Sequence, residues 1–258
     1  MGFKKKAGKL KGILGLSIAL ANASFKIKNE GMYLGFLWYF LSPLIMFIIL
    51  YFIFSTRTGA GIPFYSLYLL IGIVMYNFFQ SNIAESARLI IAENKGLIKS
   101  INFPRESIII SNVIKNSFSH VFEMIVFGIM IVFFGANLSG ILYYLPIFVF
   151  YSLFTLGVSF LMASLSVYFF DLKNIWEFFS RILFFATPIF YSVSSGSTLY
   201  YANLFNPLYY FISLARGLII YNHLELWLAL GCILWSLGFF IAGLFVFKKL
   251  KSKFAEMI

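Results

Sequence analysis

The sequence predicts an all-α membrane protein, because it is strongly apolar, poor in charge and organised in long hydrophobic runs. Of its 258 residues, 61% are hydrophobic and 11% are charged, whereas a soluble domain has about 25% charged residues. So few charges cannot keep a globule of this length in water. We therefore expect lipid to be the solvent for much of the surface.

Six apolar runs qualify, or nearly qualify, as spanning helices, for which roughly 20 apolar residues are needed. These runs cover residues 34–54, 64–84, 108–134, 142–170, 178–193 and 226–247. The fifth run is short and contains Pro188. No soluble domain, repeat or low-complexity linker interrupts the pattern, so residues 1–258 are expected to form one transmembrane domain.

The distribution of Lys and Arg predicts the orientation. With six spans and a cytosolic N-terminus, 17 of the 20 basic residues lie on the cytosolic side, and only Arg57 and Arg216 lie outside. Basic residues concentrate on the cytosolic side of membrane proteins, so both termini are expected there. Two alternatives would move the C-terminal lysines outside: cleavage of residues 13–23 as a signal peptide, and a seventh span at 204–221.

Two segments that do not span are expected to be helical. Residues 4–29 are interpreted as an amphipathic helix in the cytosolic interface, with Leu10, Ile13, Leu14 and Phe25 facing inward. In residues 204–221, Asn206 resembles an N-cap and Pro207 a first helical residue. This segment is therefore predicted to be a re-entrant or interfacial helix in the outer leaflet, between spans five and six.

The residue inventory argues against an enzyme that works with its own side chains. Cys232 is the only cysteine, the chain has two histidines, and its nine acidic residues are scattered. No catalytic residue and no metal ligand is assigned, and the net charge of +11 is attributed to membrane orientation rather than to nucleic-acid binding.

A polar stripe along the third span is the main exception to the apolar pattern: Asn112, Asn116, Ser119, His120 and Glu123. Hydrogen bonding between helices is the favoured interpretation, and a proton relay through His120 and Glu123 is the alternative. Lys115, beside the stripe, is expected to extend its ammonium group to the cytosolic interface.

Three further patterns have both a functional and a structural interpretation. Phe36, Phe40, Phe47, Tyr51 and Phe54 share one side of the first span; from the residues alone, a packed or lipid-facing surface is favoured over a track for sugars. The short amphipathic piece at 94–105 suits docking into a cytosolic partner or an ordinary interfacial loop. Arg88 and the N-terminal lysines suit a phosphorylated lipid headgroup or orientation alone.

Several segments together resemble ABC-2 type permeases that export polysaccharides and teichoic acids, most closely those of O-antigen exporters. The resemblance lies in residues 33–44, 68–72 with 77–79, 94–105, 170–172 with 187–191, and 205–207 with Arg216. One departure is Phe170, where the family often has Arg.

The resemblance implies a homodimer that works with two copies of a separate ATPase in the bacterial inner membrane. ATP and magnesium would bind to that partner, and no cofactor to this chain. The cargo would be a polyprenyl-pyrophosphate-linked polysaccharide. Capsule or teichoic acid export, export of small hydrophobic drugs, proton-coupled transport and a membrane-embedded glycan or lipid transferase using His120 and Glu123 remain alternatives.

The resemblance also implies roles for residues and makes the sugar track the favoured interpretation of the first span. A dimeric channel lined by spans one and five would use Phe36, Trp38, Tyr39, Phe40, Phe47, Tyr51, Phe54, Phe185 and Tyr191. The lipid pyrophosphate would bind to Lys4, Lys5, Lys6 and Arg88. A coupling helix would contact the ATPase through Asn94, Leu97, Ile98, Ile101, Phe103 and Arg105.

Overall fold

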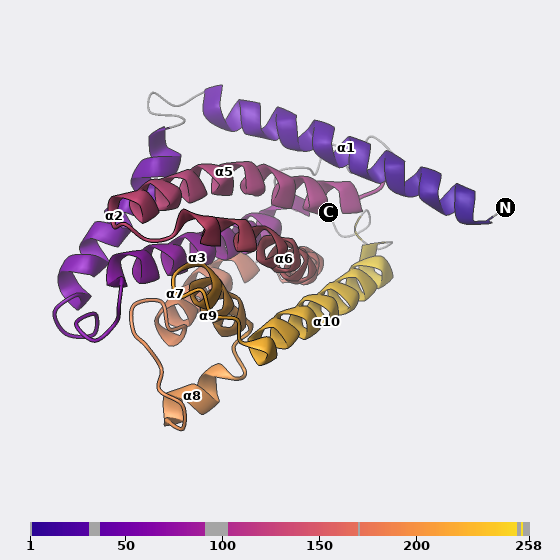
Figure 1. The fold of residues 1–258 in the computed structure, drawn as a ribbon. Helices are drawn as coiled ribbons and strands as arrows, with labels where there is room; N and C mark the ends of the chain where they lie inside the picture. The colour runs from indigo at the N-terminus through magenta and orange to yellow at the C-terminus, as the bar shows by residue number, and fades with distance from the viewer. Residues whose placement is uncertain (1, 31–36, 91–102, 170, 252–253, 255–258) are drawn as a thin grey trace.

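A computed structural model describes residues 2–30, 37–90, 103–169, 171–251 and 254 (Figure 1). All regular structure among these residues is helical. The elements are α1 (Gly2–Glu30), α2 (Trp38–Phe54), α3 (Tyr65–Arg88), α5 (Glu106–Phe133), the 3₁₀ helix η3 (Leu138–Tyr143), α6 (Tyr144–Ser166), α7 (Leu172–Ala186), α8 (Thr198–Asn203), α9 (Pro207–Ile219) and α10 (Leu226–Leu250).

Helix α3 lies at the centre of the bundle. It contacts α2, α5, α6, α7 and α9, and 18 of its 24 residues are buried. Its backbone also receives a hydrogen bond from a neighbouring helix, since Tyr151 Oη of α6 donates to Met75 O at 2.7 Å. The second predicted span is therefore an internal helix, whose apolar residues meet protein rather than lipid.

Four segments are long and apolar enough to cross a membrane: α3, α5, η3 with α6, and α10. Helix α2 is apolar but has only 17 residues. The predicted fifth span, 178–193, does not coincide with one helix, because α7 begins at Leu172 and ends at Ala186. Pro188 explains the early end: it has no N–H for a helical hydrogen bond and disfavours helical backbone at Thr187, which is extended.

The predicted helix start at Asn206 and Pro207 is confirmed. Asn206 Oδ1 accepts a hydrogen bond from the Leu208 N–H at 3.1 Å, and Pro207 is the first residue of α9. One side of α9 is buried against α3, α6 and α10. The depth of this helix in a membrane stays a prediction.

Helix α1 packs along the first turns of α5 (Figure 1). Ser107 Oγ donates to Ile13 O at 3.3 Å, and Ser17 and Ala21 are fully buried in the contact. Leu14 is 47% exposed, so it does not pack on α5, and its predicted position facing the membrane stays a prediction. Small side chains make the contact and let the helices approach closely, while Leu14 lies beside it. The side chain of Leu10 lies outside the described residues.

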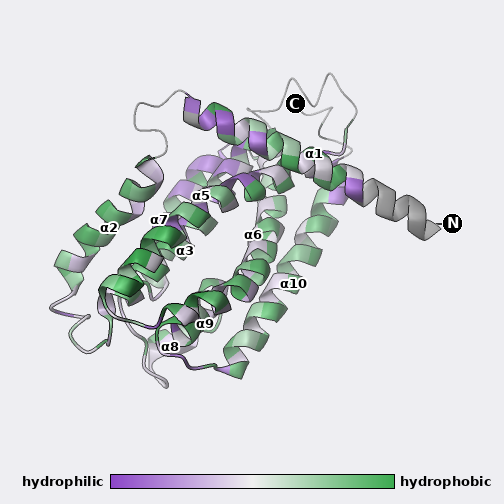
Figure 2. Cartoon of the chain, turned by 45° about the horizontal axis from the view of Figure 1, so that its top comes forward, coloured by the Kyte–Doolittle hydropathy of each residue, from purple (hydrophilic) through white to green (hydrophobic). Residues whose placement is uncertain are grey.

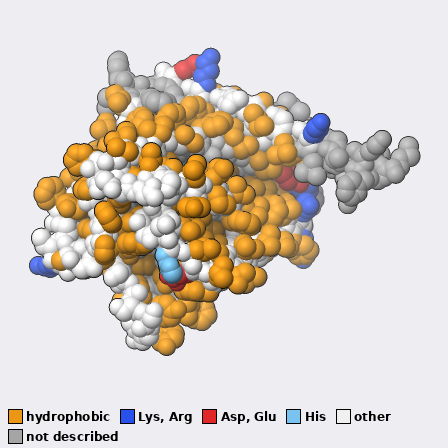
Figure 3. Space-filling model, in the orientation of Figure 1, with side chains coloured by type: hydrophobic (Ala, Val, Ile, Leu, Met, Phe, Trp, Pro, Cys, Tyr) orange, Lys and Arg blue, Asp and Glu red, His pale blue; other side chains and the backbone are white. Residues whose placement is uncertain are grey.

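The outside of the bundle is apolar, as the composition predicts. Figure 3 shows a face covered by hydrophobic side chains, with most charged groups near its edges and one acidic group beside a histidine lower on the face. Figure 2 shows hydrophilic residues gathered on α1 and the neighbouring turns of α5, whereas α2, α6 and α10 are mostly hydrophobic. Lipid therefore suits the flanks of the bundle, and a polar cluster lies at the end where α1 packs.

Candidate functional site

The aromatic side of α2 packs onto its own chain. Phe47 is 8% exposed, and Phe54 stacks on Phe190 with ring centroids 4.4 Å apart. The exposed side chains of α2 in its middle and last turns are Ile45, Ile48, Ile49, Phe52 and Ile53. The ring of Phe47 therefore belongs to the core of this chain, and its predicted place on a channel surface stays a prediction. Phe36 lies outside the described residues.

The other predicted channel rings differ in exposure. Trp38 is 52% and Phe185 is 59% exposed. The remaining rings, Tyr39, Phe40, Tyr51, Phe54 and Tyr191, are half-buried. Among these rings, Trp38 and Phe185 therefore offer the largest surfaces to a substrate.

A groove separates α2 from α7, with α3 as its floor. It has a volume of about 340 Å³ and is lined by Ser42, Met46, Tyr76, Asn77, Gln80, Ser180, Arg181, Phe184 and Phe185. Tyr76 Oη donates to Ser180 O and fixes α7 to the floor. The structure thus places the first predicted span and the helical part of the fifth on the two sides of one groove.

The segment after α7 is tied to the ends of α2 and α3. Tyr65 Oη and Thr58 Oγ1 donate to Phe190 O at 2.9 and 3.0 Å. Tyr68 Oη donates to Tyr191 O at 2.8 Å. These bonds hold the segment after α7 against the residues that follow α2 and the first turn of α3.

Arg216 is a buried residue that stabilises the segment directly after α7, where the helix ends before Pro188. It is 3% exposed and donates to the carbonyls of Pro188 and Ile189 at 2.6 and 2.7 Å. It also donates to Tyr68 O at 2.9 and 3.0 Å. A buried guanidinium with five donors can satisfy carbonyls that a broken helix leaves free. We predicted Arg216 only as an outer charge; a lone Arg in an apolar stretch was the signal for this role.

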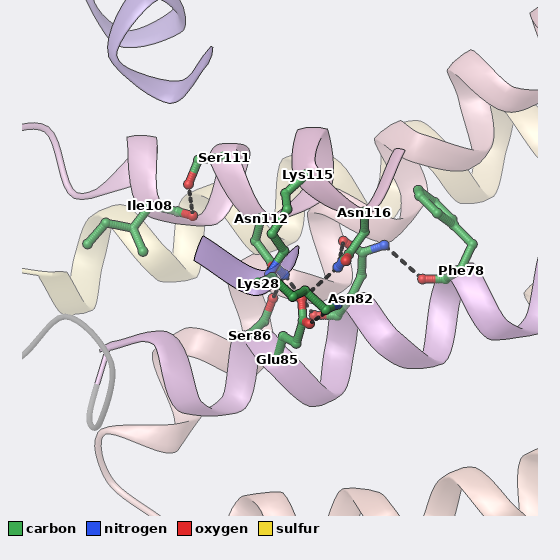
Figure 4. Close-up of polar contacts among 10 residues, drawn as sticks. All are labelled: Lys28, Phe78, Asn82, Glu85, Ser86, Ile108, Ser111, Asn112, Lys115 and Asn116. Atoms are coloured by element: carbon green, nitrogen blue, oxygen red, sulfur yellow. Dashed lines mark hydrogen bonds and ion pairs between the residues drawn. The ribbon is translucent and has the colours of Figure 1, made fainter. Parts of the chain in front are cut away.

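The polar stripe of α5 forms hydrogen bonds between helices, as favoured from the sequence (Figure 4). Asn112 Nδ2 donates to Asn82 O at 3.2 Å. Asn116 Nδ2 donates to Asn82 Oδ1 at 3.2 Å and to Glu85 Oε2 at 2.8 Å. Asn112 and Asn116 therefore join α5 to α3 over about one helical turn.

Glu85 is the centre of this network and was missed in the sequence. Lys115 Nζ lies 2.8 Å from its Oε2, and Lys28 Nζ of α1 lies 3.4 Å from its Oε1 (Figure 4). Lys115 is only 8% exposed and its ammonium group pairs with Glu85, so its predicted reach to the interface stays a prediction. A carboxylate one helix away is a better partner, because pairing lowers the cost of keeping the charge inside. Glu85, Lys28 and Lys115 also border a pocket of about 420 Å³ between α1, α3 and α5.

His120 lies in the continuation of the stripe. Its Nε2 is 2.6 Å from Tyr144 Oη and its Nδ1 is 3.2 Å from Glu123 Oε2. Its ring stacks on Phe148 with centroids 5.0 Å apart. Within the described residues, no three His, Cys, Asp or Glu side chains are grouped so as to hold a metal ion.

The predicted lipid-pyrophosphate and coupling sites are described only in part. The side chains of Lys4, Lys5 and Lys6, and all of Asn94, Leu97, Ile98 and Ile101, lie outside the described residues. Arg88 is half-buried in the last turn of α3, and Phe103 is half-buried before α5.

Arg105 connects the end of the predicted coupling segment to the C-terminal end of α10. It donates to the backbone oxygen of Lys251, whose ammonium group pairs with Glu106. Phe254 is fully buried beside this cluster, with the Arg105 guanidinium 6.0 Å from its ring centroid. No local pattern in the sequence indicates that the start of α5 and the C-terminal end of α10 meet here.

Comparison with known proteins finds relatives along nearly the whole chain. A family model described as ABC-2 type transporter matches residues 17–220. An O-antigen export system permease protein RfbA from Klebsiella pneumoniae is 29% identical over 251 residues, which are 94% of this chain and 95% of that protein. A protein of the same name from Myxococcus xanthus is 26% identical over 182 residues, 70% of each chain.

Proposed function

The chain belongs to the ABC-2 type transporter family, and on that premise we propose that it is the permease subunit of an ATP-driven exporter of lipid-pyrophosphate-linked polysaccharide. The observation that carries the proposal is the likeness to O-antigen export permeases over 94% of the chain. The helical bundle with an apolar outside agrees with a multi-pass membrane protein. The named relatives favour an O-antigen-like glycan over a hydrophobic drug or another cell-envelope polymer.

In this proposal, two copies of the chain form the channel, and the groove between α2 and α7 contributes its wall. The groove combines the exposed ring of Phe185 with the polar side chains of Asn77, Gln80 and Ser42. Rings pack against the C–H faces of sugars without fixing their register, so a polymer can slide. Trp38 and the half-buried Tyr51, Phe54 and Tyr191 extend this lining.

ATP hydrolysis belongs to a separate subunit, present in two copies, which binds ATP and magnesium. Residues 94–105 transmit its movement as a coupling helix. The contact of Arg105 with Lys251 supports this proposal, because it links that segment to α10 as well as to α5. A push on the segment would then reach two spanning helices.

The cytosolic side receives the substrate, with both termini on that side. Lys4, Lys5, Lys6 and Arg88 bind the lipid pyrophosphate, because clustered cations attract anionic headgroups. The four C-terminal lysines and the basic α1 support this orientation.

Deletion of the gene tests the proposal. The deletion strain is expected to lose surface polysaccharide and to accumulate lipid-linked polysaccharide on the cytosolic face. A plasmid copy should restore export, and the copy with Trp38→Ala and Phe185→Ala should restore less. Phe245→Ala is the matched control, because Phe245 is 67% exposed on α10, away from the groove. Unchanged surface polysaccharide in the deletion strain would refute the proposed function.

A further inference from the structure

A second pocket lies behind α2, separate from the groove but sharing part of its lining. It is enclosed by α2, α3, α5 and the end of α1, and it has a volume of about 200 Å³. At about 30 Å³ for each water in the liquid, this is the space of six or seven waters. The pocket thus has the size of one sugar ring, and a lipid tail would not fit its polar lining. Ser42, Asn77 and Gln80 border both the pocket and the groove.

Several polar side chains around this pocket have no hydrogen-bond partner within the described residues. Asn77, Gln80 and Ser81 lie on one face of α3, at the helical spacing of three and four residues. None of their side chains forms a hydrogen bond among the described residues, although all three are half-buried. Opposite them on α5, Ser119 Oγ is buried and has no hydrogen-bond partner in the described part of the chain.

Side-chain amides without a hydrogen-bond partner need an explanation in a spanning helix, since lipid offers them no hydrogen bond. Asn112 and Asn116, on the same seam, show the usual solution: each bonds to α3. Asn77 and Gln80 instead border both the pocket and the groove. Such groups require a polar occupant that supplies both donors and acceptors, because each side-chain amide has both.

The charges at the pocket indicate a neutral occupant. Lys28 and Glu123 are the two ionic groups in its lining, and each already has a partner, Glu85 and His120 respectively. Glu123 uses one carboxylate oxygen for His120, which leaves the other to accept from a ligand hydroxyl. An anion would meet this carboxylate, and a cation would meet the ammonium group.

The aromatic wall narrows the ligand class further. Trp38 borders the pocket and is 52% exposed, and Tyr39 lies beside it. An indole ring packs well on the C–H face of a pyranose, while amides and a carboxylate bind its hydroxyl groups. If water alone occupied the pocket, it would bond to the polar groups but would make no use of the exposed ring of Trp38.

We propose that this pocket, lined by Trp38, Asn77, Gln80, Ser81, Ser119 and Glu123, is a saccharide-binding subsite that holds one neutral sugar ring of the glycan beside the groove. The inference rests on the proposed function as a polysaccharide permease and adds a place where the sugar is recognised. The amides shared by pocket and groove let a bound ring pass between them without losing all its hydrogen bonds.

Binding of free glycan to the intact transporter tests the subsite. The permease, purified with its co-expressed ATPase in lipid nanodiscs, is titrated with delipidated glycan released by mild acid from the strain's own lipid-linked polysaccharide. Tryptophan fluorescence and calorimetry report binding. Asn77→Leu with Gln80→Leu is expected to weaken binding by about tenfold or more, because the hydrogen bonds of two side-chain amides to the sugar are lost. Asn174→Leu, which removes an exposed amide from α7, should leave the affinity unchanged.

Two additions keep the test decisive. Ser81→Leu fills the pocket without touching the shared amides, and it should weaken binding even if the double variant fails to assemble. Inorganic pyrophosphate serves as a second probe; if it competes with the glycan at this pocket, the ligand is an anionic headgroup and the proposal is wrong.

The outcomes separate this inference from the proposed function. If the wild-type gene supports export but all pocket variants bind glycan within about twofold of the Asn174→Leu control, the subsite is refuted and the function stands. If deletion of the gene leaves surface polysaccharide unchanged, the proposed function fails whatever the pocket binds.

Discussion

The guanidinium of Arg216 lies over the ring of Tyr68, 3.4 Å from its centroid, and donates two hydrogen bonds to the carbonyl of the same residue. Its other bonds go to Pro188 and Ile189, after the end of α7. One side chain of α9 therefore holds α3 and the break after α7 together. The position of the chain directly after α7 depends on this side chain.

Arg216→Met should destabilise the protein strongly. It leaves the buried carbonyls of Pro188 and Ile189 without their donor, and each unsatisfied group costs about 1–3 kcal/mol. Arg216→Lys should recover only part of the loss, because an ammonium group cannot span carbonyls as a planar guanidinium does. Thermal unfolding in detergent measures the effect, with the exposed Arg57→Met as control. Equal melting temperatures for the Arg216 and Arg57 variants would contradict the assigned role.

The pair of Glu85 and Lys115 predicts a non-additive mutant cycle. Glu85→Leu alone leaves a buried ammonium group unpaired and should cost about 3–5 kcal/mol. Lys115→Leu alone should also destabilise, whereas the double variant should regain much of the loss, because no uncompensated charge remains. Melting temperatures of the four proteins give the coupling. Additive losses would show that the two groups do not depend on each other.

Two glycines of α10 provide a matched pair for its packing on α6. A Cβ on Gly243 would lie 2.1 Å from Gly157 O, whereas a Cβ on Gly238 would meet nothing within 4 Å. Gly243→Ala should therefore force the helices apart at a cost of about 1–3 kcal/mol. Gly238→Ala should be neutral or slightly stabilising. Both are measured by unfolding in detergent, and a Gly243→Ala protein as stable as the wild type would refute the close contact.

Much of the helical layout could be predicted from the sequence. Long apolar runs predicted the helices that became α3, α5, α6 and α10, because length and hydropathy suffice for such elements. The pair of Asn206 and Pro207 predicted the start of α9, since capping is a local property. The third-span stripe was correctly interpreted as a seam between helices.

Features that depend on contacts between distant residues could not be predicted. Hydropathy treats α3 as a lipid-facing span, and only the packing of five neighbours shows it to be internal. The partner of Lys115 is Glu85, 30 positions away, so no local pattern reveals the pair. The side of α2 that carries Phe47 was correctly grouped, but nothing in the spacing says whether that side faces a channel or the core.

The contact of Lys251 with Glu106 and Arg105 predicts a role for the C-terminal end of α10 in coupling. Lys251→Met removes the ion pair with Glu106, which loosens the segment before α5. It should lower export more than Lys249→Met, because Lys249 is exposed and has no such contact within the described residues. Surface polysaccharide relative to the amount of assembled complex measures the effect. Equal export by the two variants would show that the contact of Lys251 with Glu106 has no role in coupling.

The central claim is that this chain carries a lipid-linked polysaccharide across the membrane with energy from a partner ATPase. The most direct test reconstitutes both proteins in liposomes and follows the transfer of lipid-pyrophosphate-linked glycan from the ATPase side to the opposite side, where a glycan-specific antibody detects it. Transfer should require ATP and the ATPase, and should fall with Trp38→Ala and Phe185→Ala but not with Phe245→Ala. Transfer at the same rate without ATP, or none by an assembled complex that hydrolyses ATP, would contradict the account.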